Sequence, residues 1–229
     1  MQQNYEDLQK KIEYRFCDID LLLTALTHSS YLHEKNLEKS KCNERFEFLG
    51  DAVLELVSSE FLINEHPDMP EGKLTRLRAS MVCEPSLAMC ARDIQLGSYL
   101  RMGKGEDFTG GRERDSIISD AFEALIGAIY LDGGFASAKE FIHKFVFNDL
   151  ENKQLFYDSK TILQEMVQGS HMGNLTYRLL SEEGPDHNKT FSVVALIDET
   201  MYGTGQGKTK KAAEQEAAYK TILKLREKK

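Results

Sequence analysis

The periodicity of the apolar residues changes near residue 150, and this change restricts the possible fold more than any other feature of the sequence. Before it, apolar residues recur three or four positions apart, as at Phe46, Leu49, Val53 and Leu56, which is the spacing of one helical face. We find no convincing strand alternation in that part. After it, the order becomes helix, strands, helix. The sequence therefore predicts an all-α domain followed by an α+β domain.

We place the first domain at residues 1–148, a polar linker at 149–157 and the second domain at 158–229. In the second domain we expect a helix over residues 161–168 and strands over 176–181, 190–197 and about 201–205. A last helix begins at Thr209. The order of these elements is α-β-β-β-α.

The balance of acidic and basic residues also changes near residue 150. Residues 158–229 carry 11 basic and 10 acidic side chains, and the whole chain has a net charge of −8. The first 157 residues therefore hold the whole acidic excess, about −9. The total charge taken alone argues against a nucleic-acid partner, because phosphates repel carboxylates. The uneven distribution means that this argument must be tested region by region.

Acidic residues follow one face of the helix predicted over residues 43–56. Glu44, Glu47 and Asp51 stand at positions i, i+3 and i+7, and such residues share a face. A solvent-facing stripe is the ordinary interpretation of this pattern.

A second predicted helix, over residues 117–131, is harder to explain in that way. It is apolar almost all round and therefore buried on most sides, yet it contains Asp120 and Glu123 one turn apart. Buried carboxylates need a metal, a cation or protonation, and Gly127 lets another backbone come close. If this face meets Glu47 and Asp51, four carboxylates converge and favour Mg²⁺, which usually serves phosphate chemistry.

Glu71 follows Pro70 in a predicted turn. It could be a further outer ligand of such a metal. An ordinary carboxylate at a helix N-terminus is an equally good interpretation.

Lysines cluster where a glycine-rich turn enters the last predicted helix: Lys208, Lys210 and Lys211. A helix N-terminus attracts anions, but lysines there oppose the helix dipole. Their position favours phosphate binding over the alternative of a solubilising cluster.

The remaining sequence patterns either exclude a class of protein or give little information about function. We find no secretory signal, no apolar run near the roughly 20 residues that span a bilayer, and no metal-binding spacing among the four cysteines. These features predict a cytoplasmic protein without membrane contact. Residues 103–112 are expected to form an ordinary surface loop. Glu140 and His143 make a single Glu-x-x-His, whereas a di-iron helical protein needs two.

The sequence resembles bacterial ribonuclease III over nearly its whole length. The segment Asn43-Glu-Arg-Phe-Glu-Phe-Leu-Gly-Asp51 is close to the family signature, and Ser116-Ile-Ile-Ser-Asp-Ala-Phe-Glu-Ala-Leu125 matches a second family motif. The tail resembles a double-stranded RNA-binding domain. It shares Gly184-Pro-Asp-His187 and Lys210-Lys-Ala-Ala-Glu-Gln-Glu-Ala-Ala218 with that domain.

The resemblance implies a homodimeric endoribonuclease specific for double-stranded RNA, acting in rRNA and mRNA precursor processing and decay. Its products would carry 5′-phosphate and 3′-hydroxyl ends with short 3′ overhangs. Mg²⁺ is the expected cofactor, with Mn²⁺ able to replace it. A non-cleaving double-stranded RNA-binding regulator is the alternative.

The resemblance also assigns residue roles. The metal ligands would be Glu47, Asp51, Asp120 and Glu123, of which Asp51 and Glu123 are also the catalytic pair. Glu44 and Glu71 would be supporting residues. The RNA-binding residues would be Thr161, Gln164, Glu165, His187, Lys208, Lys210 and Lys211.

Overall fold

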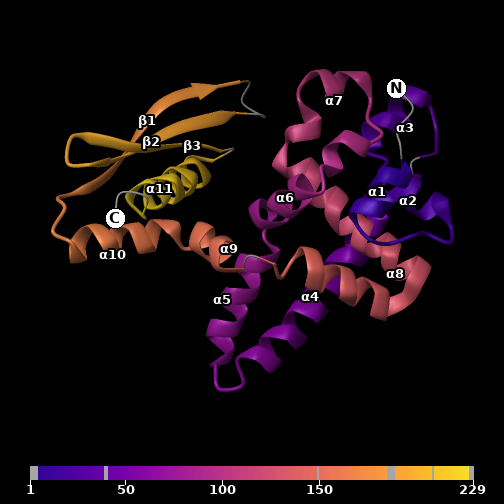
Figure 1. Ribbon diagram of the computed structural model, residues 1–229. Coiled ribbons are helices and arrows are strands. Elements are labelled where there is room, and N and C mark those ends of the chain that lie inside the picture. The colour runs from indigo at the N-terminus through magenta and orange to yellow at the C-terminus, as the bar shows by residue number, and fades with distance from the viewer. Residues whose placement is uncertain (1–4, 39–40, 149, 185–188, 208, 227–229) are drawn as a thin grey trace. The chain divides into compact units, whose positions relative to one another are not determined.

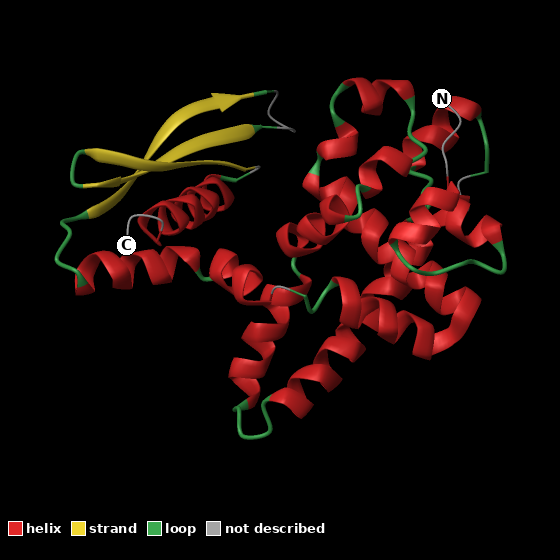
Figure 2. Cartoon of the chain, viewed as in Figure 1, coloured by secondary structure: helices red, strands yellow, loops and turns green. Residues whose placement is uncertain are grey.

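The computed structural model describes residues 5–38, 41–148, 150–184, 189–207 and 209–226. The chain divides into two compact units, Met1–Leu150 and Glu151–Lys229. Figure 2 shows that, within the described residues, every strand lies in the second unit. The predicted fold class, an all-α unit followed by an α+β unit, is therefore confirmed.

The first unit contains eight α-helices and two 3-10 helices in its described part. They are α1 Tyr5–Lys11, α2 Ile19–Ala25, α3 Ser29–Lys35, α4 Glu44–Glu65, α5 Glu71–Val82, α6 Glu84–Asp93, η2 Leu96–Tyr99, α7 Lys104–Phe108, η3 Gly111–Glu113 and α8 Asp115–Phe145. Helix α8 runs through the centre of this unit (Figure 1). Its side chains Ile118, Phe122, Leu125 and Ile129 are completely or almost completely buried, as the apolar pattern predicts.

Helix α8 is longer than the segment 117–131 predicted from the sequence. The backbone changes direction at Gly134, where φ is +77°, a conformation that glycine adopts at little cost. The Asp132 carboxylate next to this bend accepts hydrogen bonds from the Tyr14 hydroxyl and from the backbone of Cys17 and Asp18. Beyond the bend the chain resumes a helix because Phe141 and Ile142 are buried in the same core.

The second unit consists of α9 Leu150–Tyr157, α10 Ser159–Gly169, β1 Leu175–Glu183, β2 Thr190–Ile197, β3 Thr200–Gly207 and α11 Lys210–Arg226. The strands form an antiparallel sheet in the order β1-β2-β3, and α10 and α11 cover one face of it (Figure 1). A Cβ at Gly205 would lie under 3.0 Å from the backbone of α11. The small residues of β3 therefore let this helix lie directly on the strand.

Two short segments differ from the sequence-based predictions. The expected linker, 149–157, is mostly helix α9, because its Leu155 is buried in the core of the second unit beside Leu163 and Ile222. The expected surface loop at 103–112 contains α7 and η3. In both cases contacts with distant residues stabilise a helix that the local sequence does not indicate.

Candidate metal centre and nucleic-acid interface

Helices α4 and α8 touch backbone to backbone through two glycines. A Cβ added at Gly50 of α4 would lie under 3.0 Å from the carbonyl oxygen of Glu123, and one added at Gly127 of α8 would collide in the same way with that of Phe46. Real Cβ atoms do not approach so closely, so both positions require glycine. This contact brings the predicted ligands Glu47 and Asp51 of α4 near Asp120 and Glu123 of α8.

The electrostatics of the four carboxylates show that they are neighbours. The pKa of Glu123 is raised to about 8, first by burial and then by the negative charges of Asp51, Asp120 and Glu47. The pKa of Glu47 is also raised, first by burial and then by Asp120, Glu44 and Asp51. Burial raises the pKa of Asp120, partly offset by His28 and a hydrogen bond from Ser119. Within the described residues, therefore, the acids share one strongly negative region.

This negative region has no paired counter-ion among the described residues. Among the residues that the structure describes, no lysine, arginine or histidine forms an ion pair with Glu47, Asp51, Asp120 or Glu123. The next acid along α4, Glu55, differs because it pairs with Arg78 at 2.7 Å. Glu55 therefore has the ordinary role of a surface acid in an ion pair.

The donor chemistry of the four residues fits a hard divalent cation, because all are carboxylates and no described cation forms an ion pair with them. Their side chains are not gathered into a coordination shell. In the described part of the chain, no group of three or more His, Cys, Asp or Glu side chains is positioned to hold a metal ion. The two helices thus place the donors next to one another, and a metal would have to draw the side chains together.

The two supporting residues lie in different places. Glu44 is exposed in the first turn of α4 and contributes to the raised pKa of Glu47. Glu71 is exposed at the start of α5, where its carboxylate accepts a hydrogen bond from Thr75 at 3.0 Å. The part of α4 after Asp51 separates Glu71 from the four acids by about 21 Å at 1.5 Å per residue. Within one chain, therefore, Glu71 lies outside the group.

Two further residues near the site are Gly50, which makes a close helix contact that was not predicted, and His28, which has a structural role. A glycine inside a helix costs about 1 kcal/mol relative to alanine, so Gly50 within the signature segment was a readable signal for a close approach. His28 is the N-cap of α3: its Nδ1 accepts from the backbone N–H of Ser30 and lies 2.8 Å from the Ser30 hydroxyl.

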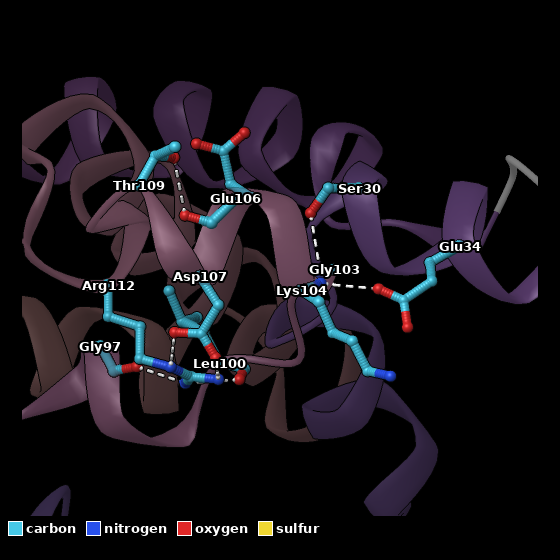
Figure 3. Close-up of polar contacts among 10 residues, drawn as sticks. All are labelled: Ser30, Glu34, Gly97, Leu100, Gly103, Lys104, Glu106, Asp107, Thr109 and Arg112. Atoms are coloured by element: carbon cyan, nitrogen blue, oxygen red, sulfur yellow. Dashed lines mark hydrogen bonds and ion pairs between the residues drawn. The ribbon is translucent and has the colours of Figure 1, made fainter.

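The same hydroxyl anchors the segment that follows η2. Figure 3 shows that Ser30 Oγ accepts a hydrogen bond from the Gly103 N–H at 3.0 Å, while the Glu34 carboxylate accepts from the Lys104 N–H at 2.6 Å. Two exposed or partly exposed residues of α3 therefore fix the start of α7. This explains why a glycine-rich polar stretch is ordered here.

The predicted RNA-binding residues of α10 share its exposed side. Thr161, Gln164 and Glu165 are exposed, whereas Leu163 and Val167 are buried in the core. Thr161 and Gln164 also line a hollow of about 370 Å³ between α10 and the beginning of β1. The amphipathic helix thus presents its polar side chains outward, where a ligand can reach them.

The lysines at the start of α11 are exposed as predicted from the sequence. Lys210 and Lys211 lie in its first turn, and the Thr209 hydroxyl accepts a hydrogen bond from the Ala212 N–H at 3.1 Å, as an N-cap does. The Lys210 ammonium lies 5.8 Å from the centre of the Phe191 ring. Lys208 and His187 lie outside the described residues.

Two known families match the chain in succession. The family described as ribonuclease-III-like matches residues 18–150, and the double-stranded RNA binding motif matches residues 159–225. Together they define a nuclease domain of the ribonuclease III class joined to a double-stranded RNA-binding domain, hereafter the nuclease domain and the RNA-binding domain.

Curated relatives agree over the full length. The chain is 52% identical over 221 residues to Ribonuclease 3 of Caldanaerobacter subterraneus subsp. tengcongensis, covering 95% of this chain and 96% of the relative. It is 45% identical over 227 residues to Ribonuclease 3 of Staphylococcus haemolyticus, covering 98% and 93%. The chain belongs to the ribonuclease III family, and the resemblance seen in the sequence is confirmed.

Solved structures are similar to the nuclease domain of this chain. The nuclease domain of ribonuclease III from Campylobacter jejuni, described with a flexible region involved in dimer formation, is 45% identical to this chain with a TM-score of 0.59. It covers 62% of this chain and 96% of that one. A second structure of the same domain has a TM-score of 0.58 at 44% identity, covering 64% and 95%.

No helix in the described parts of the chain is both long enough and apolar enough to cross a bilayer.

Proposed function

We propose that the chain is a Mg²⁺-dependent endoribonuclease that cuts double-stranded RNA in the cytoplasm, in rRNA and mRNA precursor processing and decay. The main supporting observation is the contact of α4 with α8, which places carboxylates from two helices side by side without a described counter-ion. The products carry 5′-phosphate and 3′-hydroxyl ends with short 3′ overhangs.

Each acid has a role in this proposal. Glu47, Asp51, Asp120 and Glu123 would hold the metal, and Asp51 and Glu123 would also form the catalytic pair. When bound, Mg²⁺ polarises the scissile phosphate and activates the attacking water; Mn²⁺ has similar ligand preferences and can replace it. Glu123, whose pKa is about 8 in the metal-free chain, is mostly protonated at neutral pH and releases its proton when the site is filled.

The RNA-binding domain supplies most of the affinity for the duplex in this proposal. Thr161, Gln164 and Glu165 of α10, together with His187, contact the minor groove, and Lys208, Lys210 and Lys211 contact phosphates. Such domains recognise the A-form shape with little sequence reading. The exposure of the described members of this set supports these roles.

A homodimer through α4 is part of the same proposal. Phe48, Leu56 and Ile63 lie along one side of this helix and are 80%, 59% and 60% exposed. Exposed apolar side chains in one row are typical of a protein–protein interface. Glu44, exposed at the beginning of the same helix, supports the dimer contact, and Glu71 of one chain serves the acids of the other.

Sedimentation velocity tests the dimer. We expect Phe48→Asp to convert dimers to monomers, whereas Phe108→Asp, which changes a phenylalanine that is 93% exposed on α7, leaves the dimer intact. A Phe48→Asp protein that sediments as a dimer would contradict the proposed interface.

The activity is tested with a long, perfectly paired, end-labelled RNA duplex and the full-length protein. With Mg²⁺ we expect short duplexes with 5′-phosphate ends and a constant stagger between the two cuts, and with EDTA we expect binding without cleavage. Binding without cleavage in the presence of both Mg²⁺ and Mn²⁺ would identify the chain as a non-cleaving regulator.

A further inference from the structure

The nuclease domain contains a cavity that is not lined by the four acids. Its volume is about 540 Å³, which is in the range of small-molecule sites. The polar part of its wall comes from Tyr5, Tyr31, Arg101 and Arg112, and the apolar part includes Leu100 and Met102. None of the proposed metal ligands lines it, so the cavity is distinct from the proposed metal site.

One of the two arginines in the cavity wall, Arg112, forms hydrogen bonds that stabilise the fold. Figure 3 shows that Arg112 donates to the Asp107 carboxylate through Nε at 2.8 Å and Nη2 at 3.2 Å. Its Nη1 donates to the carbonyl oxygens of Gly97 and Leu100 at 2.9 and 2.8 Å. These contacts neutralise the charge of Arg112 and hold η2 against the segment that follows, so Arg112 shapes the wall of the cavity.

The other arginine keeps its charge. The backbone fixes Arg101, because its N–H donates to Leu26 and its carbonyl oxygen accepts from the His28 N–H. Its guanidinium lies 4.6 Å from the centre of the Tyr31 ring and donates to the Thr27 hydroxyl at 3.3 Å. No carboxylate within the described residues forms an ion pair with Arg101, so the concave wall carries one uncompensated cation.

A second cation stands near the same ring. The Lys35 ammonium lies 6.0 Å from the centre of the Tyr31 ring. The adjacent carboxylate of Glu34 accepts the backbone N–H of Lys104. A partly enclosed site with positive charge attracts anions more strongly than an open surface does.

We propose that this cavity binds a nucleoside 5′-monophosphate, either free or as the 5′-terminal nucleotide of an RNA strand. The Arg101 guanidinium is the partner of the phosphate, since its planar donors match phosphate oxygens. The tyrosine rings and the apolar side chains receive the base, because bases pack favourably on aromatic faces. The volume accommodates both parts of such a ligand, whereas an inorganic anion would leave most of it unfilled.

The test uses methyl NMR of the full-length protein labelled at its eight methionines, with EDTA present so that the four acids hold no metal. Met102 lines the cavity, and its signal is assigned with Met102→Leu. We expect adenosine 5′-monophosphate to shift this signal saturably, with inorganic phosphate and adenosine each binding at least about tenfold more weakly.

Three variants locate the binding. Arg101→Gln is expected to weaken adenosine monophosphate binding at least about tenfold, as the loss of a charged hydrogen bond predicts. Arg76→Gln removes the same charge from an exposed position on α5 and is expected to change nothing. Because Arg101 also contacts Thr27, Tyr31→Phe is a milder variant that keeps the ring under the guanidinium, and we expect it to weaken binding about threefold.

Short single-stranded RNAs distinguish the two sources of the ligand. If a 5′-phosphorylated tetranucleotide binds more tightly than the mononucleotide, the ligand is an RNA end; equal affinity assigns the free nucleotide. The proposal is overturned if about 10 mM nucleotide leaves the Met102 signal unmoved or if Arg101→Gln binds as the unaltered chain does. Equal binding of inorganic phosphate, or of a 5′-hydroxyl tetranucleotide, also overturns it.

Discussion

We propose that both domains meet phosphates, yet they carry opposite charges at the proposed places of contact. In the nuclease domain, Glu47, Asp51, Asp120 and Glu123 lie on two helices, and burial together with the charges of the other three acids raises the pKa of Glu123 to about 8. In the RNA-binding domain, Lys210 and Lys211 stand exposed at a helix start. Lysines bind phosphate directly, whereas carboxylates need a metal between themselves and the phosphate. The net charge of −8 is a sum over both domains and does not show this difference between them.

Both domains use glycine to obtain the necessary contacts. Gly50 and Gly127 let α4 touch α8, and Gly203 and Gly205 let β3 touch α11. The first contact sets the spacing of the acids and the second fixes the helix that carries the lysines. If this comparison is right, cleavage and duplex binding can be removed separately.

The largest expected effect comes from Glu123→Gln. Removing this carboxylate should lower cleavage of a labelled duplex about 1000-fold or more, as the loss of a central catalytic group does, with duplex affinity unchanged. Glu140→Gln, an exposed acid on the same helix α8, should cleave normally. Cleavage by Glu123→Gln at the rate of the Glu140→Gln control would contradict the assignment of Glu123 to the active site of the nuclease domain.

Gly50→Ala should have the next largest effect. Its Cβ would collide with the backbone of Glu123, which costs about 3 kcal/mol or more and lowers the melting temperature of the nuclease domain by about 6 °C or more. Differential scanning calorimetry measures this shift. Gly72→Ala is the matched control, because nothing lies within 4 Å of its Cβ. Equal melting temperatures for the two variants would show that the helix contact is looser than described.

The double variant Lys210→Gln with Lys211→Gln addresses the other domain. We expect duplex affinity to fall about tenfold or more and the slope of log affinity against log salt to become smaller by about 2, one for each lost phosphate contact. Filter binding over a range of salt concentrations measures both. Lys224→Gln, near the other end of α11, should bind normally. An unchanged salt slope in the double variant would exclude phosphate contacts for these lysines.

The smallest effect is on the pH dependence of metal binding. Because Glu123 has a pKa of about 8 and must be ionised to bind a cation, apparent Mg²⁺ affinity should rise about fivefold from pH 7 to 8 and less than about twofold from pH 8 to 9. Calorimetry in buffers of different ionisation enthalpy should detect nearly one proton released at pH 7. No proton release at pH 7 would show that Glu123 is not a ligand.

Much of this molecule could be predicted from the sequence, because its main elements carry strong periodic patterns. Strand β2 was predicted at its observed bounds, and the apolar run of α8 indicated a buried helix that contains two acids. The sequence also indicated which acids share a face. The position of Lys210 and Lys211 at the start of α11 was also predicted, although the helix dipole disfavours lysines there.

The features that were missed depend on contacts between distant residues. Helix α7 forms in a glycine-rich segment because Ser30 and Glu34, about 70 positions earlier in the chain, fix its first residues. Helix α9 forms in a polar segment because Leu155 enters the core of the RNA-binding domain. The glycine inside the helix at Gly50 indicates a close approach, but which residues make it appears only when α8 lies against α4. No local pattern predicts such contacts.

The central claim is that acids from two different helices form one metal site. The most direct measurement is a calorimetric Mg²⁺ titration of the full-length chain and of two variants, Asp51→Asn on α4 and Glu123→Gln on α8. We predict that each variant binds Mg²⁺ at least about tenfold more weakly than the unaltered chain. Mg²⁺ binding by either variant with the affinity of the unaltered chain would contradict the account.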